Sequence, residues 1–178
     1  MKKNHKEIPT NLEILCKSKE RPRTGDVFVV KPRGDDCYFG LVVNSDIKLV
    51  NVFGEPSNPN NWDVVLGYIY NQQSANKQEI PKLDLTKLLL PPLLLDVWCW
   101  KLGYVERVGN ITLTPDHVLP RHCFLQVSLL PEQGESYRDE HGRPLARQTE
   151  PCSTYGLTPF RGLDDMVSRA LGIPEVKE

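Results

Sequence analysis

The chain has 178 residues, of which 39% are hydrophobic and 25% are charged, and its formal net charge is −1. This length is enough for one domain with a sizeable core, which excludes a chain that is disordered throughout. The near-neutral charge gives no general electrostatic basis for binding nucleic acid.

The sequence offers no candidate membrane span. The longest nearly uncharged apolar stretch, residues 88–95, contains two prolines and is far shorter than the roughly 20 residues that a transmembrane helix needs. The basic first residues are followed by no continuous apolar segment and no small-residue cleavage site, so we expect no signal peptide. We therefore expect an intracellular, cytoplasmic protein that does not interact with a membrane.

Positive charge is concentrated near the N-terminus. Residues 1–24 carry seven Lys or Arg and three Glu, so the remainder of the chain is mildly acidic. We expect 1–24 to be a basic arm that need not be fully ordered. It precedes a single mostly β domain over 25–178, whose last part, 131–178, is a C-terminal extension.

Short β-rich runs separated by turn residues begin at Gly25. The second run is apolar on both sides, with Tyr38 and Val42 on one face and Phe39 and Leu41 on the other, which places it centrally in a sheet or a closed barrel. Gly40 within it indicates a bulge, a bend or a neighbour packed against bare backbone. The short connections predict an antiparallel meander over 26–53. Its strands are expected at 26–31, 37–43 and 47–53, with turns at 32–36 and 44–46.

The rest of the chain adds further strands and one helix. Leu163, Val167 and Leu171 have helical spacing, which predicts an amphipathic helix near 162–171. The sequence thus predicts a mostly β (α+β) fold: an antiparallel, strongly bent or barrel-like sheet with one C-terminal amphipathic helix. Additional strands are expected at 63–70, 97–101, 105–108 and 124–129. A loop is expected at 54–62, a turn at 109–110, and a loop or hairpin tip at 137–145.

The cysteine pattern gives no metal site. The nearest set of ligands, His117, His122 and Cys123, has no spacing typical of zinc, so we expect neither a metal nor another cofactor. Without an export signal, free thiols are expected, and a cysteine within an apolar run packs as a small hydrophobe. The five cysteines are Cys16, Cys37, Cys99, Cys123 and Cys152.

Common catalytic motifs are absent, including phosphate-binding, dinucleotide-binding, nucleophile-elbow and H-E-x-x-H patterns, so no catalytic residue is assigned. Asp139, Glu140 and His141 could supply an acid, a base and an orienting group. Adjacent turn residues point apart, however, which favours a solvated turn. Cys123 beside His122 could be a nucleophile, but it precedes an apolar strand, which favours a buried structural thiol.

Three tryptophans have two interpretations each. Trp98 and Trp100 would project from one face of a strand, either to stack bases or to fill the core, and the scarcity of flanking cations favours the core. Trp62 lies in a Pro- and Asn-rich loop, where it is a candidate anchor for a partner or a plug at one end of the sheet.

The first two strands carry a family resemblance. The run from Gly25 and Asp26 to Phe28, a turn with Gly and Asp, and then Tyr38-Phe39-Gly40 resemble the opening of the immunity protein 26 family. The resemblance implies a mostly β protein, encoded beside a bacterial polymorphic toxin, that binds the toxin and neutralises it without chemistry of its own. It also implies structural roles for the motif residues, which are Gly25, Asp26, Phe28, Tyr38 and Gly40.

The expected partner is therefore the cognate toxin, with no nucleic acid involved; the sequence does not indicate an oligomeric state. Asp35, Asp36, Asp139 and Glu140 are candidate contacts because acidic side chains steer a cationic partner, and Trp62 is the candidate anchor.

Two alternatives remain open. The same strands resemble small-barrel toxin endoribonucleases or an RNA-binding domain, which need a cationic groove, and Arg33 is the one arginine between the first two strands. The other is an adaptor domain that binds a peptide at a sheet edge.

Overall fold

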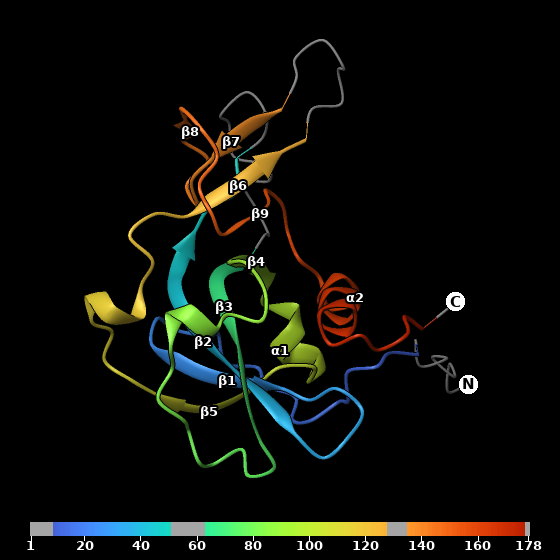
Figure 1. Cartoon of the computed structure of the whole chain (residues 1–178). Coiled ribbons are helices and arrows are strands. Elements are labelled where there is room, and N and C mark those ends of the chain that lie inside the picture. Colours follow the sequence, from blue (N-terminus) through green and yellow to red (C-terminus); the bar gives the residue numbers. More distant parts are fainter. Residues whose placement is uncertain (1–8, 51–62, 128–134, 177–178) are drawn as a thin grey trace.

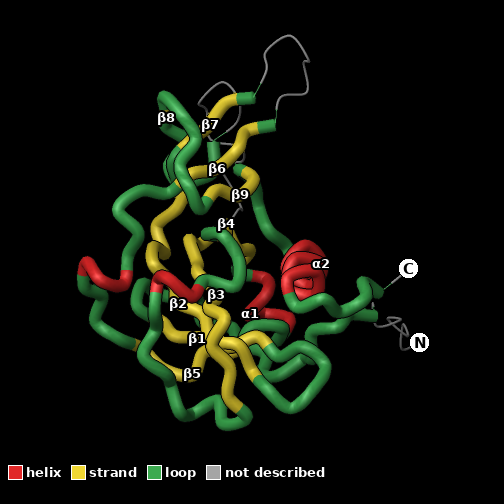
Figure 2. The backbone as a smooth tube through the Cα atoms, viewed as in Figure 1, coloured by secondary structure: helices red, strands yellow, loops and turns green. Residues whose placement is uncertain are grey.

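The computed structural model describes residues 9–50, 63–127 and 135–176, which form two sheets with a helix packed beside them (Figure 1; Figure 2). In the larger sheet the order is β4-β3-β2-β1-β5, and all neighbouring strands are antiparallel. Its strands are β1 (Asp26–Val30), β2 (Cys37–Ile47), β3 (Val64–Ser74), β4 (Leu93–Asp96) and β5 (Glu106–Asn110).

The smaller sheet has the order β8-β7-β6-β9, and its β6 and β9 run parallel. It stands at one end of the larger sheet, whereas α2 lies to the side (Figure 1). Its strands are β6 (Cys123–Gln126), β7 (Ser136–Arg138), β8 (Pro144–Leu145) and β9 (Cys152–Thr154). The helices are η1 (Leu85–Lys87), α1 (Trp98–Leu102), η2 (Pro115–His117) and α2 (Phe160–Ala170).

The predicted mostly β fold with a C-terminal helix is confirmed. The larger sheet is bent but open, because β4 and β5 are its two edges. Three register shifts between β2 and β3 supply the bend, since an extra residue on one strand increases the local twist.

Each face of the larger sheet carries its own hydrophobic core, as the two-sided pattern of the second run predicts. Val42 belongs to the cluster that includes Leu163 and Val167 of α2. Phe39 and Leu41 belong to the cluster on the opposite face, which also holds residues of the smaller sheet. The helix α2 therefore packs on one face of this central layer, while the smaller sheet contributes Phe124 to the core on the opposite face.

The predicted turn at 44–46 and strand at 47–53 are wrong as far as the structure describes them. β2 continues without a turn to Ile47, and the third strand of the meander is β3. Register shifts after Val42 and Asn44 accommodate the polar residues inside β2. The Asn44 side chain also accepts a hydrogen bond from the Asp46 N–H. Asn and Asp often make this local contact in turns, which is why the sequence predicted one here.

The predicted strand at 97–101 is also wrong, because these residues form α1. The Asp96 carboxylate accepts a hydrogen bond from the Trp98 N–H at the start of the helix. At its end Gly103 adopts φ +91°, and its N–H donates to the Trp100 carbonyl. These two residues are ordinary helix start and stop signals, but a Trp-Cys-Trp alternation between them mimics a strand.

The described part of the basic arm is attached to the domain through its main chain, although its Lys and Arg side chains are exposed. The Leu15 N–H donates to Gly103 and the Ser18 N–H to Trp100. Leu12 is buried, and its N–H donates to the Asp164 carboxylate of α2 over 2.6 Å. Residues 9–24 thus belong to the folded unit. None of the helices in the described ranges is long and apolar enough to span a bilayer.

Candidate functional site

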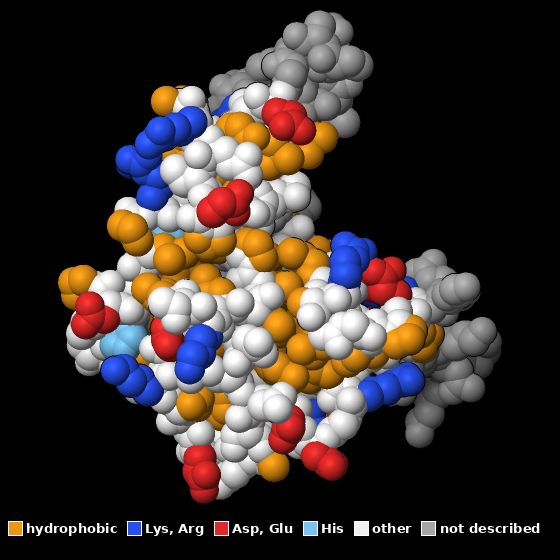
Figure 3. All heavy atoms as spheres, in the orientation of Figure 1, with side chains coloured by type: hydrophobic (Ala, Val, Ile, Leu, Met, Phe, Trp, Pro, Cys, Tyr) orange, Lys and Arg blue, Asp and Glu red, His pale blue; other side chains and the backbone are white. Residues whose placement is uncertain are grey.

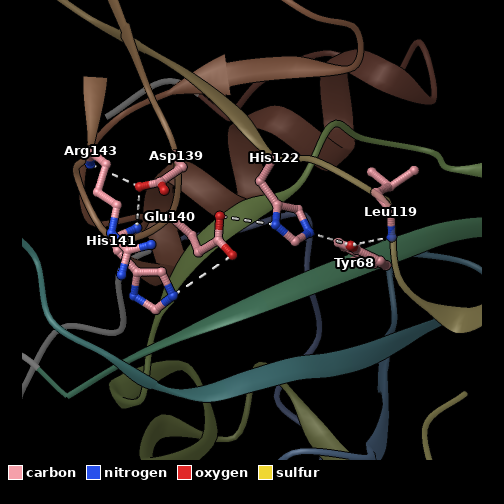
Figure 4. A network of polar contacts seen from close by, with 7 residues as sticks. All are labelled: Tyr68, Leu119, His122, Asp139, Glu140, His141 and Arg143. Carbon is pink, nitrogen blue, oxygen red and sulfur yellow. Dashed lines mark hydrogen bonds and ion pairs between the residues drawn. The ribbon is translucent and has the colours of Figure 1, made fainter. Parts of the chain in front are cut away.

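A buried chain of polar side chains joins the two sheets (Figure 4). The Tyr68 hydroxyl on β3 lies 2.5 Å from His122 Nε2, just before β6. His122 Nδ1 lies 3.1 Å from a carboxylate oxygen of Glu140, which follows β7. The Leu119 N–H donates to the Tyr68 hydroxyl. A phenol, an imidazole and a carboxylate from three distant parts of the chain therefore form one connected network.

The partners fix the direction of the hydrogen bonds. A carboxylate only accepts, so Nδ1 of His122 carries a proton. In the neutral imidazole, Nε2 then accepts from the Tyr68 hydroxyl, which itself accepts from Leu119. Burial raises the pKa of Tyr68 to about 12, although the Leu119 bond opposes this. Tyr68 therefore remains a donor at neutral pH.

Glu140 is held in its ionised form. Burial by itself raises the pKa of Glu140, but hydrogen bonds from His122 and from its own main chain, together with electrostatic interactions with His122 and His141, outweigh burial. The net pKa is below the ordinary value. Glu140 is thus an internal partner of His122 rather than a free acidic contact on the surface.

This network has the residue types of a catalytic relay, but its side chains are not accessible to a substrate. His122 is 5% exposed and Tyr68 is fully buried. Both ring nitrogens of His122 are engaged with side chains of the chain itself. Substrate activation needs a base within hydrogen-bond reach of the substrate. The arrangement instead fastens the β7–β8 hairpin and the smaller sheet onto β3.

The structure gives separate contacts to the two histidines of the nearest set of potential metal ligands, from which no metal site was expected. His117 Nδ1 lies 3.0 Å from the Thr114 hydroxyl in η2, whereas His122 contacts Tyr68 and Glu140. Within the described ranges, no group of three or more His, Cys, Asp or Glu side chains could hold a metal ion.

The acidic candidates lie on separate surfaces. Asp35 is exposed and Asp36 is half-buried in the β1–β2 connection, far from the β7–β8 hairpin that contains Asp139 and Glu140 (Figure 1). One Asp139 carboxylate oxygen accepts from the main-chain N–H groups of His141 and Arg143, which closes the hairpin tip. The structure therefore does not bring the four carboxylates together. Trp62 lies outside the described residues.

Four of the motif residues lie at buried or tightly packed positions in or next to the larger sheet. Asp26 is 1% exposed. It accepts hydrogen bonds from the Arg23 N–H and the Asn110 side chain, at 2.8 and 2.9 Å, and thereby joins β1 to β5. Gly25 has φ +88°, and a Cβ there would lie 2.3 Å from the Ile111 carbonyl oxygen. Phe28 is fully buried, and Tyr38 packs partly buried against the same core.

One exposed aromatic surface was not predicted. Trp98 of α1 is 53% exposed, and Lys101 Nζ lies 4.9 Å from the centroid of its ring. Lys101 also lies 4.0 Å from the Asp63 carboxylate, which pairs with Arg21 at 3.0 Å. We call Trp98, Lys101, Asp63 and Arg21 the Trp98 surface.

The two tryptophans of α1 separate because the segment is helical. Trp100 is 1% exposed and packs edge-on against Phe28 at 5.3 Å between ring centroids, so the core interpretation is confirmed for Trp100 alone. Trp98 points to solvent. The sequence signal for this separation was the pair Asp96 and Gly103, which delimits a short helix.

Apolar side chains also gather across the middle of one face of the molecule (Figure 3). A groove of about 440 Å³ is lined mostly by apolar residues of the η1 region and by Glu150 and Pro151. The lining gives no charge pattern that would identify an occupant.

Comparison of the chain with models of protein families, with curated proteins and with solved structures gave no match.

Proposed function

We propose that this chain is an immunity protein: it binds a bacterial toxin encoded by a neighbouring gene and neutralises it, in the cytoplasm and without chemistry of its own. The resemblance of residues 25–43 to the immunity protein 26 family motivates the choice of partner. The motif residues are compatible with this proposal, because they hold β1, β2 and β5 together as a scaffold. Other surfaces of the molecule are then available to contact the toxin.

The observation that carries the proposal is the Trp98 surface. Energetically dominant interface residues are enriched in tryptophan and arginine and are surrounded by a polar rim that excludes water. Trp98 is a large exposed indole, and Lys101, Asp63 and Arg21 supply such a rim. The contact with Lys101 also restricts the indole before binding, which lowers the entropy cost of association.

The acidic contacts are revised accordingly. Asp35 and Asp36 stay as candidate steering residues on the β1–β2 connection. Asp139 and Glu140 are not included, because their carboxylates bond to the hairpin main chain and to His122. Trp62 stays a prediction that the described residues do not address.

The test is co-expression with the product of the adjacent reading frame, followed by a binding measurement on the purified pair. We expect the wild-type chain to restore growth and to form a complex that survives gel filtration. Trp98→Ala should weaken binding by about 2 kcal/mol or more, mainly through faster dissociation.

Val127→Ala is the matched control, because Val127 is similarly exposed, at 58%, but follows β6 of the smaller sheet. Its affinity should equal that of the wild type. Equal growth with and without the chain, together with no complex, would refute the proposal. Cleavage of RNA by the purified chain alone would favour the endoribonuclease alternative instead.

A further inference from the structure

Two of the five cysteines face each other in the smaller sheet. Cys123 begins β6 and Cys152 begins β9, and the two residues are direct partners in the parallel register of these strands. Side chains of directly paired residues lie on the same face of a sheet. Their Sγ atoms are 2.7 Å apart. The sequence, which separates them by 29 positions, gave no sign of this pair.

The other cysteines have different surroundings. The sulfur of Cys16 lies 3.9 Å from the main-chain oxygen of Lys17, and that of Cys99 lies 4.0 Å from the oxygen of Thr158. Cys37 is buried at the start of β2. All five cysteines are free thiols in the structure. Cys123 and Cys152 differ from the other three in the short distance between their sulfur atoms.

We propose that Cys123 and Cys152 are a site of covalent modification, where an intramolecular disulfide forms between β6 and β9 when the protein meets a thiol-oxidising environment. Neighbouring strands lie about 4.8 Å apart, which is within the roughly 4.4–6.8 Å between Cα atoms that a disulfide spans. The bond therefore needs rotation of two side chains and no movement of the strands. This inference does not depend on the proposed function.

The oxidant is a small-molecule disulfide such as oxidised glutathione. Cys152 is half-buried and Cys123 is fully buried, so Cys152 meets the oxidant first. Its thiol loses a proton to solvent, and the thiolate attacks one sulfur of the small disulfide, releasing the first small thiolate. The Cys123 thiol then also loses its proton to solvent, and its thiolate attacks Cys152 Sγ and releases the second small thiolate; each released thiolate takes up a proton from solvent. Two protein thiols are oxidised, and one small disulfide is reduced to two thiols.

The surroundings of Cys152 make this reaction slow at neutral pH. Burial raises the pKa of Cys152 to about 12, with further contributions from Cys123 and Glu150. Tyr137 of β7 also interacts with it electrostatically. Only the thiolate attacks, so the rate of the first step should rise about tenfold per pH unit between pH 7 and 9.

The disulfide would close a loop that contains the β7–β8 hairpin. That loop includes Glu140, whose carboxylate holds His122 next to Cys123. A covalent loop of this length constrains the unfolded chain, and we expect the oxidised protein to melt about 10 °C higher than the reduced one.

The experiment uses the full chain incubated with oxidised glutathione at pH 8.5, then alkylated and analysed by mass spectrometry. We expect two of the five thiols to be lost, a mass decrease of two hydrogen atoms, and one peptide pair joining Cys123 to Cys152. Cys152→Ser should retain all its remaining thiols, apart from any glutathione adduct, and should show no rise in melting temperature. Cys16→Ser, at an exposed site, should form the same cross-link as the wild type.

Three results would overturn the inference: no loss of thiols in the native chain while the denatured chain is oxidised, a disulfide that joins other cysteines, or glutathione adducts alone. If Cys152→Ser fails to fold, the wild-type peptide map and the pH dependence of the rate decide the question by themselves.

Discussion

Gly40 shows how a single position determines the packing of the larger sheet. A Cβ at this position would lie 2.2 Å from the Phe28 ring and 2.7 Å from the Tyr68 carbonyl oxygen. The sequence left open a bulge, a bend or a neighbour packed against bare backbone at Gly40. The structure has both a register shift between Tyr38 and Gly40 and the Phe28 ring packed against the Gly40 backbone. The Phe28 ring thus occupies the space that a side chain at Gly40 would fill.

Gly40→Ala should lower the free energy of unfolding by about 1–3 kcal/mol, because the Tyr68 main chain cannot withdraw from the added methyl group. Urea denaturation measures the change. Gly162→Ala is the matched control: its Cβ would be 3.5 Å from the nearest atom, and alanine favours the helix by about 1 kcal/mol. The control should be stabilised, and a loss of stability in Gly162→Ala with none in Gly40→Ala would contradict this packing.

At the scale of elements, the spacing of apolar residues predicted the strands and the helix in which that spacing matches the pattern of buried residues. β1 and α2 were expected close to their observed bounds from their apolar residues, and the start of β2 was expected correctly, although β2 continues beyond residue 43 to Ile47. α1 was missed because five residues are too few to show a helical period. The docking of the basic arm was missed for another reason. The Leu12 N–H of the arm donates to the buried Asp164 carboxylate of α2, and no local sequence pattern indicates a contact between such distant residues.

Asp164→Ala should reduce stability by about 1–3 kcal/mol, since it leaves the buried Leu12 N–H without its acceptor. Asp165→Ala, one residue further along α2 and only half-buried, should change stability by less than about 0.5 kcal/mol. Thermal unfolding followed by circular dichroism compares the two. Equal effects would show that the arm is not held through Asp164.

At the scale of the whole molecule, the union of the two sheets depends on contacts that sequence could not supply. Tyr68, His122 and Glu140 come from β3, the start of β6 and the β7–β8 hairpin, and only the finished fold brings them together. The sequence considered His122 for a metal or a nucleophile pair and Glu140 for catalysis or, as the adopted prediction, a partner contact, and it had no reason to connect either with Tyr68.

Two tyrosines of β3 test the value of this connection. Tyr68→Phe should cost about 1–3 kcal/mol, because Leu119 loses its acceptor and His122 loses its donor. Tyr70 is equally buried, and its hydroxyl has no hydrogen-bond partner among the described residues. Tyr70→Phe should therefore be neutral or stabilising. Similar losses from both substitutions in chemical denaturation would mean that the network does not join the sheets.

The contact between Leu12 and Asp164 also has a consequence for synthesis of the protein. The two residues are 152 positions apart, and a ribosome adding about 5–20 residues per second needs about 8–30 s to travel between them. During that interval Leu12 lacks the cover that Leu163 and Val167 of α2 later provide. A nascent chain therefore cannot complete this core before α2 has left the ribosome, and any protective complex that requires the finished fold must form after translation of that helix.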